Sequence, residues 1–214
     1  MSNEAPNMNY SYNAGQSPGA SSSLTMATLI ARIKSIVTNP KDCWPAFKAE
    51  PATVGDIYRN YVVYIAAIPA VAGFIGMSIV GVFGIRIPIV TGIIGALFQY
   101  AVALLMVYIG ALVAEKLAPT FGGKTDRVSA VKFIAYAFTP TWVCGIFSVL
   151  PVLAWVGIIG GLYSIYVYYQ GITPMTGVPT ERRIGFAAVS VIAMIVLGAI
   201  FGIIVGTLVA APIR

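Results

Sequence analysis

Residues 153–172 read LAWVGIIGGLYSIYVYYQGI, and this stretch decides the fold class. It contains no charged side chain, and as a helix it is long enough to cross the roughly 30 Å hydrocarbon core of a bilayer. Its glycines give the helix a small-residue face, and its tyrosines carry hydroxyl groups that lipid tails cannot hydrogen-bond. We therefore predict a transmembrane helix that packs against protein on at least one side.

The rest of the chain has the composition of a polytopic membrane protein. Hydrophobic residues make up 58% of the chain and charged residues 9%, whereas roughly a quarter of the residues of a soluble domain are charged. Hydropathy predicts five spans, at about residues 61–84, 88–114, 131–150, 151–172 and 184–211. We expect an all-α fold, a polytopic membrane helical bundle of five transmembrane helices.

Basic residues gather on one side of the predicted bundle. The N-terminal region and the loops after the second and fourth spans hold Arg32, Lys34, Lys41, Lys48, Arg59, Lys116, Lys124, Arg127, Lys132, Arg182 and Arg183. The other side holds Arg86 and Arg214. The positive-inside rule places the N-terminus in the cytoplasm and the C-terminus outside. The formal net charge of +6 favours a lipid bilayer with anionic headgroups as partner, and nucleic acid is not expected.

Three regions are expected along the chain. Residues 1–23 are rich in Asn, Ser and Gly and form a disordered tail, residues 24–60 form amphipathic or interfacial helices on the cytoplasmic face, and residues 61–211 form the transmembrane domain. Apolar side chains recur at helical spacing in residues 24–37, which predicts a helix either on the membrane surface or docked on the underside of the bundle. On the first interpretation, the membrane-surface residues are Arg32, Lys34, Trp44 and Lys48.

Few side chains in the predicted spans are suited to catalysis. No Asp, Glu, Lys or Arg lies in the core of a predicted span, histidine is absent from the chain, and the chain has two cysteines. Proton relays, metal sites and serine-hydrolase catalysis depend on such groups. We expect no enzymatic activity, no cofactor and no bound metal.

Two prolines, Pro69 and Pro140, lie inside predicted spans and should kink their helices. Asp126 precedes the third span and is placed to cap its helix. The candidates for a hydrogen-bonded polar core, or for a water-lined pathway, are Tyr100, Tyr108, Thr139, Pro140, Trp142, Tyr163, Tyr166 and Gln170. Both interpretations fit the pattern.

Glycines recur at four-residue steps in the last two spans. The fifth span carries Gly198, Gly202 and Gly206, and the fourth carries Gly157 and Gly161. Such spacing lets two helix backbones approach closely. It serves packing within the bundle and contact between copies in a homo-oligomer equally well.

Several short segments occur together in this chain. They are Asn39-Pro40 followed by Trp44, Glu50-Pro51, the loop APTFGG at 118–123, the run YAFTPTW at 136–142, Gly161-Leu162-Tyr163, and YQGI at 169–172. The combination resembles the bacterial branch of the Yip family of Ypt/Rab-GTPase-interacting proteins, over residues 29–210. The resemblance implies five spans, a cytoplasmic N-terminus and a bacterial inner membrane as location. Eukaryotic relatives are linked to Rab GTPases and to vesicle traffic between endoplasmic reticulum and Golgi.

The expected function follows from abundant packing signals beside few reactive groups. We expect a non-enzymatic integral membrane protein that organises membrane or recruits partners at the cytoplasmic face. The alternative is a channel or facilitator for a small solute or ion through the helical bundle. The sequence does not identify the protein partner.

Overall fold

The computed structural model describes the backbone of residues 26–82 and 84–210 and the side chains of residues 27–82 and 84–200. The predicted disordered tail at residues 1–23 and the basic residue Arg214 lie outside the described residues. Within the described part, the regular structure is helical apart from an isolated antiparallel bridge between Val82 and Ile85. The all-α prediction is confirmed.

Five helical segments are long and apolar enough to cross a membrane: Val54–Val80, Ile89–Phe121, Arg127–Val149, Pro151–Thr176 and Thr180–Ile200. The prediction of five spans is confirmed, although the first and third begin earlier than residues 61 and 131. Their helices begin at side-chain caps. Thr53 and Asp56 form a reciprocal capping box, and Asp126 accepts hydrogen bonds from the backbone N–H groups of Val128 and Ser129. The cap expected at Asp126 is therefore confirmed.

The spans are assembled from shorter helical pieces. The first consists of α3 (Val54–Ile57), the π-helical η1 (Tyr58–Val62), α4 (Val63–Phe74) and the π-helical η2 (Ile75–Val80). The second consists of α5 (Ile89–Leu117) and the 3-10 helix η3 (Ala118–Phe121), and the third of α6 (Arg127–Ala137), α7 (Thr139–Cys144) and the 3-10 helix η4 (Gly145–Val149). The fourth consists of the 3-10 helix η5 (Pro151–Leu153) and α8 (Val156–Thr176), and the fifth of the 3-10 helix η6 (Thr180–Arg182) and α9 (Arg183–Ala210).

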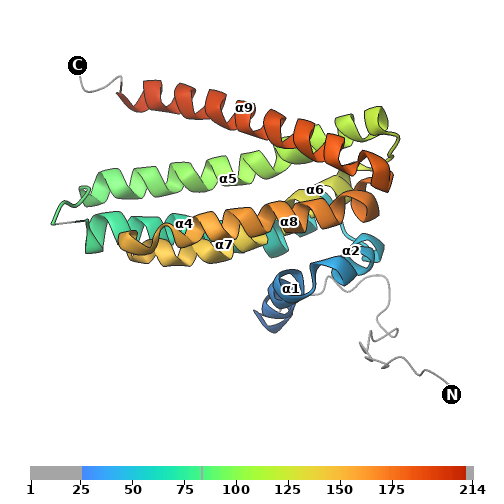
Figure 1. Cartoon of the computed structure of the whole chain (residues 1–214). Helices are drawn as coiled ribbons and strands as arrows, with labels where there is room; N and C mark the ends of the chain where they lie inside the picture. Colours follow the sequence, from blue (N-terminus) through green and yellow to red (C-terminus); the bar gives the residue numbers. More distant parts are fainter. Residues whose placement is uncertain (1–25, 83, 211–214) are drawn as a thin grey trace.

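Successive spans run antiparallel and lie side by side (Figure 1). The connections from α5 to α6 and from α8 to α9 lie at the same end of the bundle as α2, which we call the α2 end. The connections from α4 to α5 and from η4 to α8 lie at the opposite end, which we call the far end.

The two N-terminal helices, α1 (Met26–Thr38) and α2 (Pro40–Ala49), pack against the bundle (Figure 1). Leu29 and Ile36 of α1 and Trp44 and Phe47 of α2 are buried. Trp44 packs against α8 where Gly171 leaves room, because a Cβ atom at residue 171 would lie 2.7 Å from the indole ring. Of the two interpretations of this region, the structure shows the docked one.

The third span is broken at Pro140. Helix α6 ends at Ala137, and Pro140 lies in the first turn of α7. Backbone N–H groups in a first turn have no acceptor within the helix, so a proline there costs no hydrogen bond. The backbone N–H of Thr141 donates to Ser164 Oγ of α8 at 3.0 Å, and the Thr141 and Ser164 hydroxyl oxygens lie 2.8 Å apart. Pro69 lies inside α4, which continues to Phe74. The proline in the third span therefore separates two helices, and a neighbouring span satisfies the broken backbone.

In α8, close helix packing falls at Gly160, the residue before the predicted Gly161. A Cβ at Gly160 would lie 2.6 Å from Cys144 Cβ and 2.9 Å from the Pro140 carbonyl oxygen, so α8 approaches α7 there. At Gly157 and Gly161 a Cβ would meet no atom within 4 Å, and the same holds at Gly198. The side-chain surroundings of Gly202 and Gly206 lie outside the described residues. A role of these glycines in contacts between copies stays a prediction.

We expect Gly160→Ala to destabilise the bundle by about 1–3 kcal/mol, because its methyl group would collide with α7. The matched control is Gly161→Ala, which should leave stability unchanged or raise it by up to about 1 kcal/mol through helix propensity. Thermal unfolding of both variants in mild detergent measures the difference. Equal stability losses in the two variants would contradict the close approach of α7 and α8 at Gly160.

Candidate functional site

A cluster of charged and aromatic side chains lies where α1, α2 and α6 meet. It comprises Arg32 of α1, Glu50 at the end of α2, and Lys132 and Tyr136 of α6, and we call it the docking cluster. Lys132 and Tyr136 are four residues apart and so lie on one face of α6. The local sequence places Glu50 at this point, because Pro51 follows it and the backbone leaves helical geometry at residue 50.

Arg32 joins the first helix to the bundle. Its guanidinium donates to the Glu50 carboxylate at 2.6 Å and to the Tyr136 hydroxyl, and it lies 5.4 Å from the ring centroids of both Phe47 and Tyr136. Burial by itself lowers the pKa of Arg32, but Tyr136 and Glu50 outweigh it, so the net pKa is raised. Arg32 therefore stays charged and is held by one ion pair and two ring faces.

Lys132 joins the second helix to the bundle. The residue is 2% exposed, and its ammonium group donates to the backbone carbonyl oxygens of Phe47, at 2.8 Å, and of Glu50. The Phe47 carbonyl belongs to the last turn of α2, where a helix leaves its carbonyl groups without intrahelical partners and carries partial negative charge, and Glu50 is the residue directly after the helix. Lys132 thus caps α2 from another helix. Lys132 was expected in the loop after the second span, and this expectation is wrong: the residue lies inside α6, within the third span.

A buried hydroxyl pair continues the docking cluster into the bundle. Tyr61 and Thr139 are fully buried, and their hydroxyl oxygens lie 2.7 Å apart. Thr139 also donates to the carbonyl of Ala135 at 3.3 Å. The Tyr61 ring meets the Tyr136 ring edge-on, with centroids 4.9 Å apart. Thr139, a candidate for the polar core or pathway, therefore lies beside the docking cluster, as does Pro140, its neighbour in sequence.

The other candidate residues of the core or pathway fall into separate contacts. Tyr100 donates to the carbonyl of Val63 at 3.1 Å, and Tyr108 accepts a 2.8 Å hydrogen bond from Arg127. Trp142 stacks on Phe138.

Tyr163 and Tyr166 of α8 lie toward α1. Tyr163 donates to the carbonyl of Val37 in α1 at 2.8 Å, Tyr166 is 41% exposed beside Tyr163, and Gln170 is half-buried. The structure therefore does not bring the eight candidates together at one place.

Two hollows in the described part are open grooves on the outer surface. One, of about 470 Å³, is lined by Val54, Gly55, Tyr58, Leu104, Leu105 and Tyr108. The other, of about 380 Å³, is lined by Tyr64, Ala67, Ile68, Val71, Ala72, Ile75, Ile146 and Val149. Of the eight candidate residues, Tyr108 alone lines either groove. Both grooves are lined mainly by apolar side chains.

Of the four residues expected at the membrane surface, two are exposed and two contact other parts of the protein. Lys34 and Lys48 are exposed, whereas Arg32 lies in the docking cluster. Trp44 is fully buried, with its ring centroid 5.8 Å from that of Phe133. Trp44 was expected at the depth of the lipid headgroups, but it lies inside the protein, because the space beside Gly171 holds the whole indole ring.

The chemistry of the docking cluster is that of an anchor. The described residues contain no group of three or more His, Cys, Asp or Glu side chains placed to hold a metal ion. Cys43 is buried beside the cluster, and burial raises its pKa to about 11. Its thiol is protonated at neutral pH and is a poor nucleophile. The cluster thus fixes α1 and α2 to α6 through charge-assisted hydrogen bonds.

Sequence reasoning did not select Glu50, Lys132, Tyr136 or Tyr61 as site residues. One signal was available, because Lys132, Tyr136 and Thr139 recur at helical spacing and so share a face of the predicted third span. Their partners in α1, α2 and η1 are far away in sequence, and no spacing rule connects them.

Comparison with known proteins identifies relatives of the chain. The sequence model of the family described as "Yip1 domain" matches residues 34–202. "Inner membrane protein YohC" of Escherichia coli (strain K12) is 25% identical over 167 residues, which cover 74% of this chain and 86% of the relative. The protein of the same name from Escherichia coli O6:H1 (strain CFT073) gives the same figures. No solved structure matches. With its five candidate spans, the chain fits a multi-pass protein of a bacterial inner membrane.

We expect Lys132→Met to destabilise the protein by about 1–3 kcal/mol, because the last carbonyls of α2 would be buried without a donor. Lys116→Met is the matched control, since Lys116 is exposed in the last turn of α5 and should be near neutral. Thermal unfolding in detergent measures both. Unchanged stability of Lys132→Met would contradict the capping of α2 by Lys132.

We expect Arg32→Ala to loosen α1 and α2, which the alkylation of Cys43 reports. Loss of this part-exposed ion pair costs on the order of 1–2 kcal/mol, and about 1.4 kcal/mol corresponds to a tenfold larger open fraction. In a Cys144→Ala background, Cys43 should react with a maleimide severalfold faster in Arg32→Ala than in the parent. Lys34→Ala, on the exposed side of α1, should leave the rate unchanged. Equal rates in the two variants would exclude Arg32 as the anchor.

Proposed function

This chain belongs to the Yip1 domain family, and from that premise we propose that it is a non-enzymatic integral membrane protein whose α2 end recruits protein partners at the cytoplasmic face. The family is not known for enzymatic activity. The proposal is supported by one observation above all. At the α2 end, exposed charged side chains lie over a core that the docking cluster holds in place.

The core of the α2 end is α6. All residues from Ser129 to Ala137 are buried, which no other span achieves over a comparable length of the described chain. Helices α2, α3, α5 and α8 each contact α6. A helix enclosed in this way has little freedom to shift, because packed interiors are dense and tolerate few voids. It gives the surface loops a rigid support.

Two loops at the α2 end pack into one surface. Thr125 of the loop after η3 donates to the carbonyl of Met175 in α8 at 3.0 Å. Gly123 lies against the Thr176 carbonyl, where a Cβ would approach to 2.6 Å. Gly177 closes α8 with φ of 71°, a left-handed conformation that favours glycine. The loops at 122–126 and 177–182 therefore present their side chains together.

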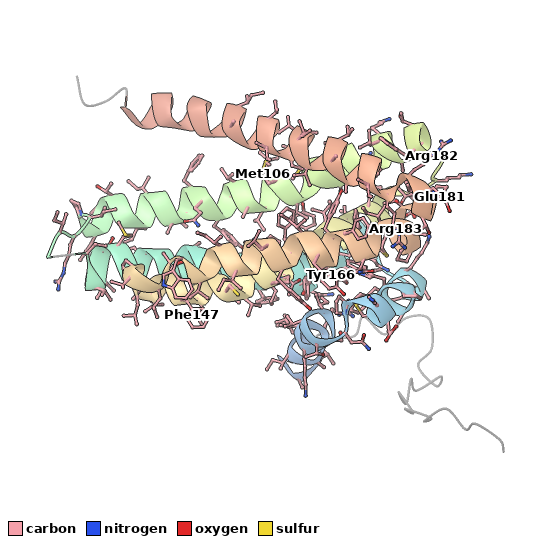
Figure 2. All side chains as sticks on the ribbon, in the orientation of Figure 1. Met106, Phe147, Tyr166, Glu181, Arg182 and Arg183 are labelled. Atoms are coloured by element: carbon pink, nitrogen blue, oxygen red, sulfur yellow. The ribbon has the colours of Figure 1, made fainter. Side chains whose placement is uncertain are left out.

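Basic residues outnumber acidic ones among the exposed charged side chains of the α2 end. The basic ones are Lys41, Lys48, Arg59, Lys116, Lys124 and Arg182, and the acidic ones are Asp42, Asp56, Asp126 and Glu181, whereas the far end carries Arg86 among the described residues. Figure 2 shows Glu181, Arg182 and Arg183 at the α2 end, beyond α8. By the positive-inside rule this end lies in the cytoplasm. A fixed, basic, water-facing surface suits an acidic patch on a partner protein, since complementary charge speeds and orients association.

Site-specific photocrosslinking in cells tests the proposal. A photoreactive amino acid at Lys124 should form discrete crosslinks to another protein, and Lys124→Glu with Arg182→Glu should weaken the same complex because both changes reverse the local charge. Position 86 at the far end is the matched control and should give no such product. Products at position 86 alone would contradict recruitment at the α2 end. Solute flux into proteoliposomes that Tyr108→Phe abolishes would favour the facilitator alternative instead.

A further inference from the structure

Most exposed large apolar side chains of the bundle lie in one part of it, and the exceptions among the described residues of the bundle are Ile85, in the loop before α5, and Ile184, at the start of α9. The others run from Tyr64 to Val80 on the first span, from Ile89 to Tyr108 on α5, from Ile146 to Val152 around the turn after α7, from Trp155 to Tyr166 on α8, and from Val189 to Ile200 on α9. We call this set the apolar belt. Among the described residues, the segments 38–63, 109–145 and 167–183 carry no exposed large apolar side chain. Residues 38–63, 109–137 and 167–183 lie toward the α2 end, whereas α7 lies beside the part of α8 that carries the belt (Figure 1).

The apolar belt is as tall as the hydrocarbon core of a bilayer. On α5 it covers residues 89–108, which at 1.5 Å per residue is about 28 Å. The hydrocarbon core measures about 30 Å. The whole second span, Ile89–Phe121, has 33 residues and is about 50 Å long, so it exceeds the hydrocarbon core by about 20 Å.

Charged groups of the candidate spans lie on the α2 side of the apolar belt. Arg127 pairs with Glu115, and their side chains are 35% and 24% exposed. Asp56 and Arg59 are exposed in the first turns of the first span. Hydrocarbon around these groups would cost several kilocalories per mole, and the apolar belt leaves them outside it.

Helix α1 lies at the edge of the apolar belt. Tyr163, near the α2 side of the belt on α8, donates to the carbonyl of Val37. Figure 2 shows Tyr166 beside α1. Phe147 lies farther toward the far end, and Arg182 lies at the α2 end (Figure 2). In Figure 1, α1 is seen nearly end-on while the spans run across the view. The helix therefore lies across the spans, in the direction of a membrane surface.

The exposed apolar side chains of α1 face the apolar belt. Ile30 is 61% exposed and Val37 is 37% exposed. At 100° per residue they lie about 160° and 140° around the helix from Arg32. Arg32 points to Glu50 and the α2 end, so Ile30 and Val37 point the opposite way. Lys34 is exposed between them in sequence.

We infer that the bilayer surface meets the protein at α1, so that Ile30 and Val37 rest on lipid and the α2 end stands in water. Lys34 then lies beside anionic headgroups, and the docked helix is also an interfacial helix. The exposed stripe of α1 continues the apolar belt, which is the reason that lipid is its occupant. The inference takes the bundle to span a bilayer and does not depend on recruitment of a partner.

Accessibility in lipid nanodiscs tests the level of the membrane. Ile184 and Ile195 are both exposed on α9, but Ile184 lies at the α2 end and Ile195 in the apolar belt. In a background of Cys43→Ala and Cys144→Ala, Ile184→Cys should react with a membrane-impermeant maleimide about tenfold faster than Ile195→Cys, because the thiolate forms in water and not in hydrocarbon. Lys116→Cys and Leu97→Cys on α5 repeat the comparison if a variant on α9 does not fold. Protection of both residues 184 and 116 would overturn the inference.

A second measurement tests the contact of α1 with lipid. An environment-sensitive fluorophore is attached at Ile30→Cys or at Ala31→Cys, which is exposed about 100° around the same helix. Vesicles containing phospholipid spin-labelled near the headgroup should quench the probe at residue 30 more strongly than at residue 31. Equal quenching at the two positions would overturn the contact. Failure of the crosslinking at Lys124 would leave both results intact, so the two proposals fail separately.

Discussion

The ammonium group of Lys132 and the two carbonyls that it binds hold much of this structure together. A lysine that is 2% exposed needs partners, and the last turn of α2 supplies them in the form of carbonyl groups that also need donors. With α2 fixed to α6, Trp44 fills the space beside Gly171, and Glu50 stands where it can bind Arg32 of α1. Helix α1 is thus held by a contact with Glu50 at the end of α2, and α2 is held by a contact with Lys132 of α6.

The break in the third span divides its environment. Before the break, α6 is enclosed by protein on every side, and after it α7 and η4 approach the surface of the apolar belt at Ile146 and Phe147. In a continuous straight helix, both halves of the span would have to lie along the same axis. The separation at Phe138, with Thr141 bonded to Ser164, lets each half take its own position against α8 without an unpaired backbone group.

Much of the fold could be predicted from composition and local pattern. Five spans follow from hydropathy, and the cap at Asp126 follows from its position before an apolar run. The family resemblance is confirmed by the match over residues 34–202. The side-chain partners could not be predicted. The spacing of glycines at four-residue steps selected Gly161, which follows Gly160 directly. Neighbouring positions lie about 100° apart around a helix, and in the structure only Gly160 faces α7.

The places of Tyr163 and Trp44 could not be predicted from the sequence either. An aromatic residue with a polar atom suits an interface with lipid and a contact with protein equally well. Trp44 was expected at headgroup depth and lies inside the bundle, whereas Tyr163 was a core candidate and binds the end of α1. Which of the two places a residue takes depends on long-range packing, which a single sequence does not contain.

The position of α1 gives the molecule an unequal cross-section. With α1 at the bilayer surface, as inferred above, the helix adds its width to the protein on the α2 side and adds nothing on the opposite side. Many copies in one membrane would then take up more area on that side than on the other. An area difference of this kind bends a bilayer toward the expanded side.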